Sequence, residues 1–186
     1  AEQKMIQSTI SVMTNVRPDH LDEMGVTLYD NAMSLSNTIP FNGKLVTVKG
    51  DINQDGQIDA LDKKISDVLA DVSKNRKTNF YQASPDDISA EYMGKFPYME
   101  NRDNVALALK VCELSGVEKK IALDGMLSVQ PDPGATIIWK INCQGKYNYF
   151  VNLMAANDPS STYHAYQRLQ SRIDKSFVCI FLNTRE

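Results

Sequence analysis

The chain has 186 residues, of which 42% are hydrophobic and 23% charged, a composition typical of a soluble globular protein with one domain or slightly more. This composition excludes collagen, a coiled coil and wholesale disorder. The formal charge is −3 and the 20 lysine and arginine residues are scattered, which argues against nucleic acid as a partner.

The first elements alternate between strand and helix. Residues 9–16 carry β-branched side chains with partial alternation and end in a Pro-containing loop at 17–19, which predicts a buried strand running into a loop. Loops at the carboxyl ends of strands are where α/β proteins place ligands. Thr27 can cap a helix with apolar residues at 28, 32 and 35, and a short strand is predicted at 45–48.

Two clear helical patterns occupy the middle of the chain. From Ile58 to Val72 the apolar residues recur at three- and four-residue steps, which predicts a helix of about four turns. A short strand is expected at 79–81. Asp103 or Asn104 is then predicted to open a helix over 105–114, which Gly116 ends from the C′ position.

A further helix is predicted at 119–127, before the strong helix breaker Pro131-Asp132-Pro133-Gly134. Beyond that turn the pattern predicts strands at 136–141 and 147–153, a helix opened by Asp158-Pro159, and a strand at 177–182. Since strands and helices alternate, the predicted fold class is α/β with a parallel sheet.

The cysteines and the chain ends bear on the compartment. Cys112, Cys143 and Cys179 lie far apart among apolar neighbours, so we expect them to be reduced and buried. No apolar run approaches the roughly 20 residues of a membrane span, and the polar start is unlike a signal peptide. These features predict a cytoplasmic protein.

Residues 51–62 match the spacing of a calcium-binding loop. Oxygen-bearing side chains, a glycine at the sixth position and an aliphatic residue at the eighth suit a hard cation of this size. The candidate Ca²⁺ ligands are Asp51, Asn53, Asp55, Gln57, Asp59 and Asp62. The alternative is an Asx-rich turn in which Asp59 caps the following helix and Asp62 occupies its N3 position, and both interpretations can hold at once.

His20 follows the first predicted strand and has acidic residues on both sides, so it is placed to bind a metal or a phosphate-bound Mg²⁺. A surface histidine in an acidic turn is the alternative. None of the Gly-Lys pairs at 43–44, 94–95 and 145–146 has the other residues of a Walker-type phosphate loop, so no such loop is predicted in this chain.

Five stretches occur in an order that resembles the Mur ligase and folylpolyglutamate synthase superfamily, and within it the family of ligase subunits of poly-γ-glutamate capsule synthases. They are residues 14–25, 36–40, 103–108, 126–134 and 150–161. The resemblance covers nearly the whole chain except the calcium-loop region, which looks like an insertion.

The resemblance implies an ADP-forming amide ligase in which ATP phosphorylates a terminal carboxylate and the amine of glutamate attacks the acyl phosphate. It implies that Asn15 orders the strand-end loop, that His20 ligates Mg²⁺, and that Asn104 faces the adenine. It further implies that Asn152, Asn157 and Asp158 belong to a domain that closes over the nucleotide. Expected partners are glutamate, the growing poly-γ-glutamate chain and membrane subunits that hold the protein at the inner face of the membrane.

The same resemblance divides the chain at 134. Residues 1–134 would be the second half of a Mur-ligase-like central ATPase domain, and residues 135–186 the start of a Rossmann-like C-terminal ligase domain. The phosphate loop and an Mg²⁺-binding glutamate would lie in a missing N-terminal half, so we expect the chain alone to be inactive. Two other hypotheses are a calcium-dependent module resembling a dockerin, and a degenerate homologue kept as a scaffold.

Overall fold

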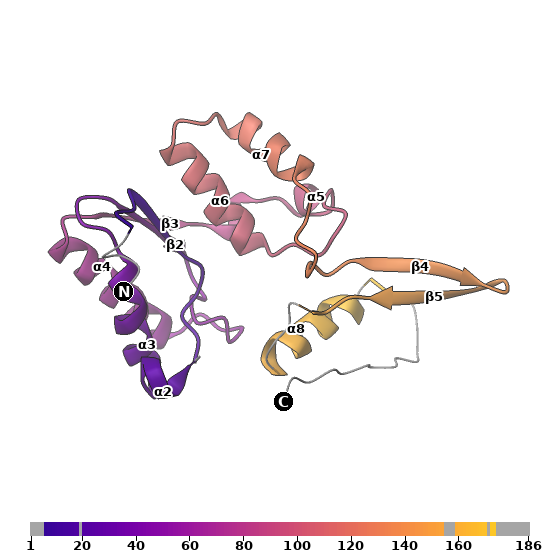
Figure 1. The fold of residues 1–186 in the computed structure, drawn as a ribbon, viewed down its shortest axis with the longest axis horizontal. Coiled ribbons are helices and arrows are strands. Elements are labelled where there is room, and N and C mark those ends of the chain that lie inside the picture. The colour runs from indigo at the N-terminus through magenta and orange to yellow at the C-terminus, as the bar shows by residue number, and fades with distance from the viewer. Residues whose placement is uncertain (1–5, 19, 155–158, 171, 174–186) are drawn as a thin grey trace. The chain divides into compact units, whose positions relative to one another are not determined.

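The computed structural model describes residues 6–18, 20–154, 159–170 and 172–173 (Figure 1). The chain divides into two compact units. The first contains Ala1–Phe96 and Glu100–Val129, and the second contains Pro97–Met99 and Gln130–Glu186.

The first unit is built on a three-stranded parallel sheet. Its strands β1 (Ile10–Met13), β2 (Lys44–Val48) and β3 (Asn79–Ala83) lie in the order β1-β2-β3. Val46 of the central strand pairs with Val12 on one side and with Tyr81 on the other. The predicted parallel α/β arrangement is therefore confirmed for this unit.

Helices bury the central strand of this sheet. Residues 45–48 of β2 are at most 1% exposed, as expected for a parallel strand covered on both faces. A core cluster joins β1 and β2 to α3 (Leu28–Leu35) and α4 (Ala60–Asn75), and α6 (Arg102–Leu114) packs against β2 and β3 (Figure 1). The 3.6-residue apolar periodicity of α4 supplies two fully buried residues, Ile65 and Leu69.

Side-chain N-caps start several helices of this unit. Thr27 is the N-cap of α3, as predicted, and it also forms a capping box with Asp30. The start of α6 differs from the prediction, because Asn101 rather than Asp103 or Asn104 is its N-cap and accepts a hydrogen bond from the Asp103 amide at 3.3 Å. Gly116 has a φ of 81° and ends α6 as expected.

The remaining elements of the first unit are short, apart from α7. They are α2 (Leu21–Met24), η1 (Ser36–Thr38), η2 (Pro85–Asp87), α5 (Ala90–Met93) and α7 (Lys119–Ser128). Helix α7 packs against α6 (Figure 1). This pairing places the second predicted helix of the region next to the first.

In the second unit, β4 (Ile138–Cys143) and β5 (Lys146–Val151) form an antiparallel hairpin, which differs from the parallel arrangement expected. Gln144 and Gly145, with φ of 51° and 79°, make a two-residue turn of the kind that joins antiparallel neighbours directly. Helix α8 (Pro159–Gln170) follows, and the predicted strand at 177–182 lies outside the described residues. The Mur-ligase-like and Rossmann-like architectures stay predictions.

The hairpin also corrects the expectation that the cysteines are buried. Cys143, at the end of β4, is exposed, and Cys112 on α6 is half-buried. Both are free thiols, while Cys179 lies outside the described residues. Across the described ranges, no helix has both the length and the apolar character needed to cross a membrane.

Candidate functional site

The carboxyl ends of the parallel strands define the edge at which this fold would place a ligand. Two strand-end loops meet there, because the Val16 amide beyond β1 donates a hydrogen bond to the Ile52 carbonyl beyond β2 at 3.0 Å. Val16 is 0% exposed and Ile52 1% exposed, and both belong to the core cluster. The segment predicted to be an insertion is thus anchored in the core of the unit.

A side-chain bridge adds the start of α6 to this edge. Arg17 Nη2 donates to Gln54 Oε1, and Gln54 Nε2 donates to Asp103 Oδ2 at 3.4 Å. Arg17 lies in the loop beyond β1 and Asp103 in the first turn of α6. The sequence reasoning missed this bridge, since nothing in the loop pattern singles out Gln54.

His20 lies on the loop beyond β1, where it is exposed and directly precedes α2. Its backbone has a φ of 44°, and its carbonyl accepts hydrogen bonds from the amides of Glu23 and Met24 at 2.9 and 2.7 Å. Asn15 is half-buried on the same loop, and its Nδ2 lies 3.5 Å from Thr14 Oγ1. The imidazole is therefore presented to solvent at the carboxyl end of the sheet.

Asn104 is exposed in the first turn of α6. Its Nδ2 donates to Glu100 Oε1 at 3.2 Å, and the same carboxylate oxygen accepts the Asn101 amide at 2.7 Å. These bonds hold the Asn104 side chain against the residues just before α6. The Gln54 bridge joins this end of α6 to the loop that carries His20.

Hydrogen bonds from backbone amides to side-chain oxygens hold the predicted calcium loop together. Asp51 accepts hydrogen bonds from the amides of Asp55 and Gly56 at 3.2 and 2.9 Å. Asn53 Oδ1 accepts the Asp55 amide and Asp55 accepts the Gln57 amide, both at 2.9 Å. In these Asx-type turns, the side-chain oxygens of Asp51, Asn53 and Asp55 each accept at least one hydrogen bond from the loop's own backbone.

The end of the loop caps α4, which confirms the predicted capping role. The Asp59 side chain accepts hydrogen bonds from the amides of Leu61 and Asp62, and the Asp62 carboxylate accepts one from the Asp59 amide at 2.9 Å. Asp62 is 3% exposed and also accepts the buried Asn53 amide at 3.1 Å. Its carboxylate therefore joins the loop to the helix.

The fit of these side chains to a metal ion can be tested on their positions. Among the residues that the structure describes, no three His, Cys, Asp or Glu side chains lie close enough together to hold a metal. The Mg²⁺ role of His20 and Ca²⁺ binding by the loop stay predictions.

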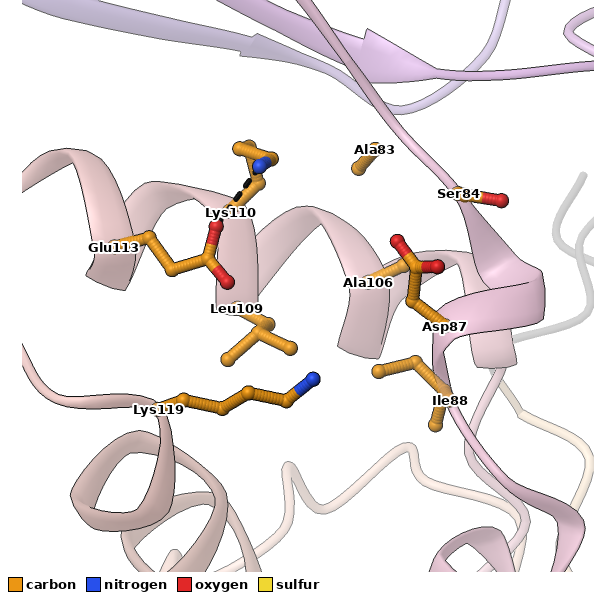
Figure 2. Close-up of a pocket in the computed structure, with 9 residues that line it drawn as sticks. All are labelled: Ala83, Ser84, Asp87, Ile88, Ala106, Leu109, Lys110, Glu113 and Lys119. Carbon is orange, nitrogen blue, oxygen red and sulfur yellow. Dashed lines mark hydrogen bonds and ion pairs between the residues drawn. The ribbon is translucent and has the colours of Figure 1, made fainter.

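One small cavity lies beyond the end of β3, between η2 and α6. Its volume of about 30 Å³ suits one or two water molecules and is far too small for a nucleotide. Figure 2 shows Lys110, paired with Glu113 at 2.8 Å, on the α6 side of this space, and Lys119 reaching toward it from the start of α7.

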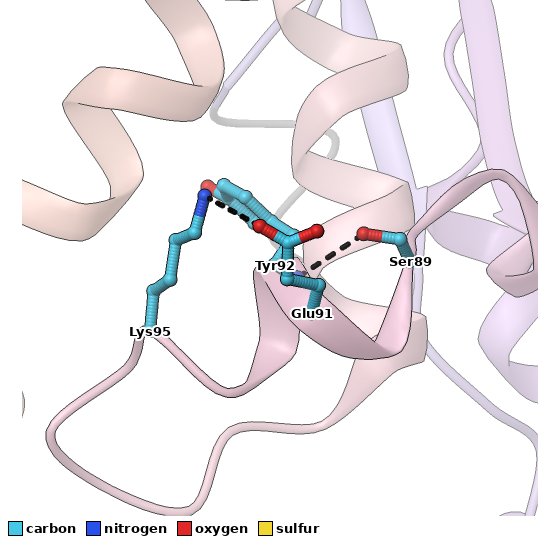
Figure 3. Close-up of polar contacts among 4 residues, drawn as sticks. All are labelled: Ser89, Glu91, Tyr92 and Lys95. Carbon is cyan, nitrogen blue, oxygen red and sulfur yellow. Dashed lines mark hydrogen bonds and ion pairs between the residues drawn. The ribbon is translucent and has the colours of Figure 1, made fainter.

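A larger, open groove of about 520 Å³ lies between α5 and α7. Tyr92 lines it and donates its hydroxyl to the Leu123 carbonyl at 2.6 Å. Figure 3 shows Tyr92 beside Lys95, whose Nζ lies 3.6 Å from Glu91 Oε1. Three lysines and two acidic side chains share its walls, so its charge is nearly balanced. None of the predicted site residues lines this groove.

In the second unit Asn152 has a local structural role. Its Nδ2 donates to the Pro133 carbonyl at 3.1 Å, and its Oδ1 accepts the Met154 amide at 3.0 Å. These bonds tie the end of β5 to the proline-rich turn. The other two residues predicted for this domain, Asn157 and Asp158, lie outside the described residues.

Comparisons with known proteins identify similar sequences. A family model of the poly-γ-glutamate synthase CapB C-terminal domain matches residues 138–186. The chain is 40% identical over 168 residues to the capsule biosynthesis protein CapB of Bacillus anthracis, and 36% identical over 169 residues to the PGA synthase CapB of Bacillus subtilis (strain 168). These matches cover 90% and 91% of the chain but 33% and 40% of the relatives. No solved structure matches it.

Proposed function

We propose, from the premise that this chain is a homologue of the CapB proteins of poly-γ-glutamate synthesis, that it takes part in making this polymer. The observation that carries the proposal is the sequence identity with two CapB relatives along nine tenths of the chain. The chain spans only about a third to two fifths of the length of these relatives. The activity named for them is therefore proposed for this chain.

The proposed reaction is ATP-dependent amide formation. A terminal carboxylate oxygen attacks the γ-phosphorus of ATP and ADP leaves. The amine of glutamate then attacks the acyl phosphate, phosphate leaves, and the nitrogen loses a proton as the amide forms. Charge on the transferring phosphoryl group must be neutralised by the site for this reaction to proceed.

The carboxyl edge of the parallel sheet supports this proposal, because it carries polar groups from two connections. His20 and Asn15 lie beyond β1, and Asn104 lies on the first turn of α6. We propose that the imidazole of His20 faces the reacting phosphoryl group and that Asn104 faces the nucleotide base.

The cavities and side-chain clusters of the described residues bear on where ATP and Mg²⁺ would bind. The cavity near the end of β3 is too small for a nucleotide, and among the residues that the structure describes no three His, Cys, Asp or Glu side chains cluster. We therefore propose that further groups complete the binding site for ATP and the metal. Membrane subunits are proposed as partners.

Trapping the activated carboxylate tests this function. The cellular protein that contains this sequence is purified and incubated with ATP, Mg²⁺, poly-γ-glutamate and hydroxylamine in place of glutamate. If an acyl phosphate forms, hydroxylamine attacks it and releases phosphate. We then expect equal amounts of ADP and polymer hydroxamate. Formation of AMP would contradict an acyl-phosphate route, and a lack of any polymer-dependent nucleotide turnover would contradict the ligase itself.

A further inference from the structure

We propose that Gln54 is a positioning residue, which holds the loop of His20 and the start of α6 at a fixed separation. This inference rests on the proposed function, because it assigns to the bridge the task of setting His20 against Asn104. No pattern in the sequence or family description points to Gln54. The assignment comes from the contacts of its side chain.

Both polar atoms of the Gln54 carboxamide make hydrogen bonds. Its oxygen accepts from Arg17 Nη2 and its nitrogen donates to Asp103 Oδ2 at 3.4 Å. A carboxamide can do both, because it carries an acceptor and a donor on one carbon, whereas a carboxylate only accepts and an ammonium only donates. The partly buried cation and anion are thus joined through a neutral group.

The backbone that carries Gln54 is fixed on the core. Ile52 is 1% exposed and its carbonyl holds the Val16 amide at 3.0 Å. Asn53 is 6% exposed, and its amide donates to Asp62, which belongs to the capping box of α4. Gln54 itself has a φ of 58°, a conformation that is uncommon for residues other than glycine. The side chain therefore projects from a rigid support.

The partners of Gln54 lie next to the residues they would position. Arg17 is three residues before His20 on the same loop, and Asp103 directly precedes Asn104 on α6. Fixing the two partners restrains both candidate site residues. Catalytic groups need such support, since a displacement of about 1 Å can cost about a hundredfold in rate.

Two substitutions separate the two halves of the bridge. Gln54→Ala removes both hydrogen bonds. Gln54→Glu keeps an acceptor for Arg17 but sets a carboxylate against Asp103. The matched control is Gln82→Ala, because Gln82 is an exposed glutamine of the same unit whose Nε2 donates to Ser66 Oγ at 3.0 Å.

Backbone amide NMR of the purified chain tests the coupling directly. In Gln54→Ala we expect shift changes at 14–17 and at 102–106 together. In Gln54→Glu we expect changes at 102–106 with 14–17 close to the wild type, and in Gln82→Ala changes at neither segment. Two results would overturn the proposal. One is that the shift changes in Gln54→Ala stay confined to residues near 54, and the other is that Gln82→Ala produces equal changes in the two segments.

A kinetic measurement then connects the bridge to the proposed reaction. In the cellular protein that contains this sequence, Gln54→Ala should lower kcat for polymer-dependent ADP release by about tenfold or more, while Gln82→Ala keeps the wild-type rate. An unchanged kcat in Gln54→Ala would overturn the positioning role. A wild-type protein without this turnover would contradict the proposed function alone, because the NMR coupling does not depend on turnover.

Discussion

Asn31 illustrates how one buried polar side chain shapes the segment behind His20. It is 0% exposed, and its Nδ2 donates to the carbonyls of Gly25 and Thr27, each at 2.9 Å. Gly25 has a φ of 101°, so the turn between α2 and α3 needs both this glycine and the asparagine that binds it. The loop from β1 to α3 is thereby held at its far end.

Removing this side chain should destabilise the fold. Asn31→Ala removes both hydrogen bonds of the Asn31 side chain and leaves a small cavity where this buried amide was, so we expect the free energy of unfolding in urea to fall by about 2 kcal/mol. The exposed Asn37→Ala serves as the control and should change it by less than about 0.5 kcal/mol. Equal stability of the two variants would show that the Asn31 hydrogen bonds contribute nothing.

At the residue scale, the sequence predicted the caps that follow a simple local rule. Thr27 and Asp59 each precede an apolar helical pattern with an acidic residue at N3, and both are N-caps. The start of α6 was placed two or three residues late, because Asn101, Asp103 and Asn104 all have side chains that can cap. The Gln54 bridge depends on tertiary contacts, so local sequence carried no signal for it.

At the element scale, the connection between β2 and α4 acts both as a turn and as a cap. Its carboxylates accept backbone amides, and these hydrogen bonds stabilise the turns of the loop. Ile52 in addition anchors it in the core. The fold of this loop is therefore expected to be independent of Ca²⁺.

Melting curves of the chain with Ca²⁺ and with a chelator test this expectation. Excess EDTA should leave the Tm unchanged, and Ca²⁺ should raise it by a few degrees at most, as mass action predicts for a weak ligand. The control is Asp51→Asn, in which any rise with Ca²⁺ should shrink. Unfolding in EDTA would favour the dockerin-like hypothesis and contradict a loop held by its backbone.

The β4–β5 hairpin shows why the sheet type of the second unit was mispredicted. The turn Gln144-Gly145 is a weaker hairpin signal than Asn-Gly, and the preceding alternation of strands and helices favoured a parallel sheet. In the register observed, Trp139 lies opposite Phe150, with ring centroids 5.5 Å apart. Such cross-strand pairs become visible only once the register is known.

At the scale of the whole molecule, helix and strand positions in the first unit followed from periodicity, because each amphipathic element faces one core. The candidate site was only partly predictable. The residue pattern singled out His20, and the family resemblance added Asn15 and Asn104. Which loops meet at the carboxyl edge depends on strand order and on long-range contacts such as that of Val16 with Ile52. The roles of the three residues stay predictions.

The central claim is that this chain acts in poly-γ-glutamate synthesis through the sheet edge that bears His20. Its most direct test is the amount of polymer made by cells in which His20→Ala replaces the wild-type residue, with exposed Lys63→Ala as the control. We expect polymer to fall by at least about tenfold in the first strain, at equal protein level, and to be unchanged in the second. Unchanged polymer in the His20→Ala strain would contradict the claim and favour a scaffold role.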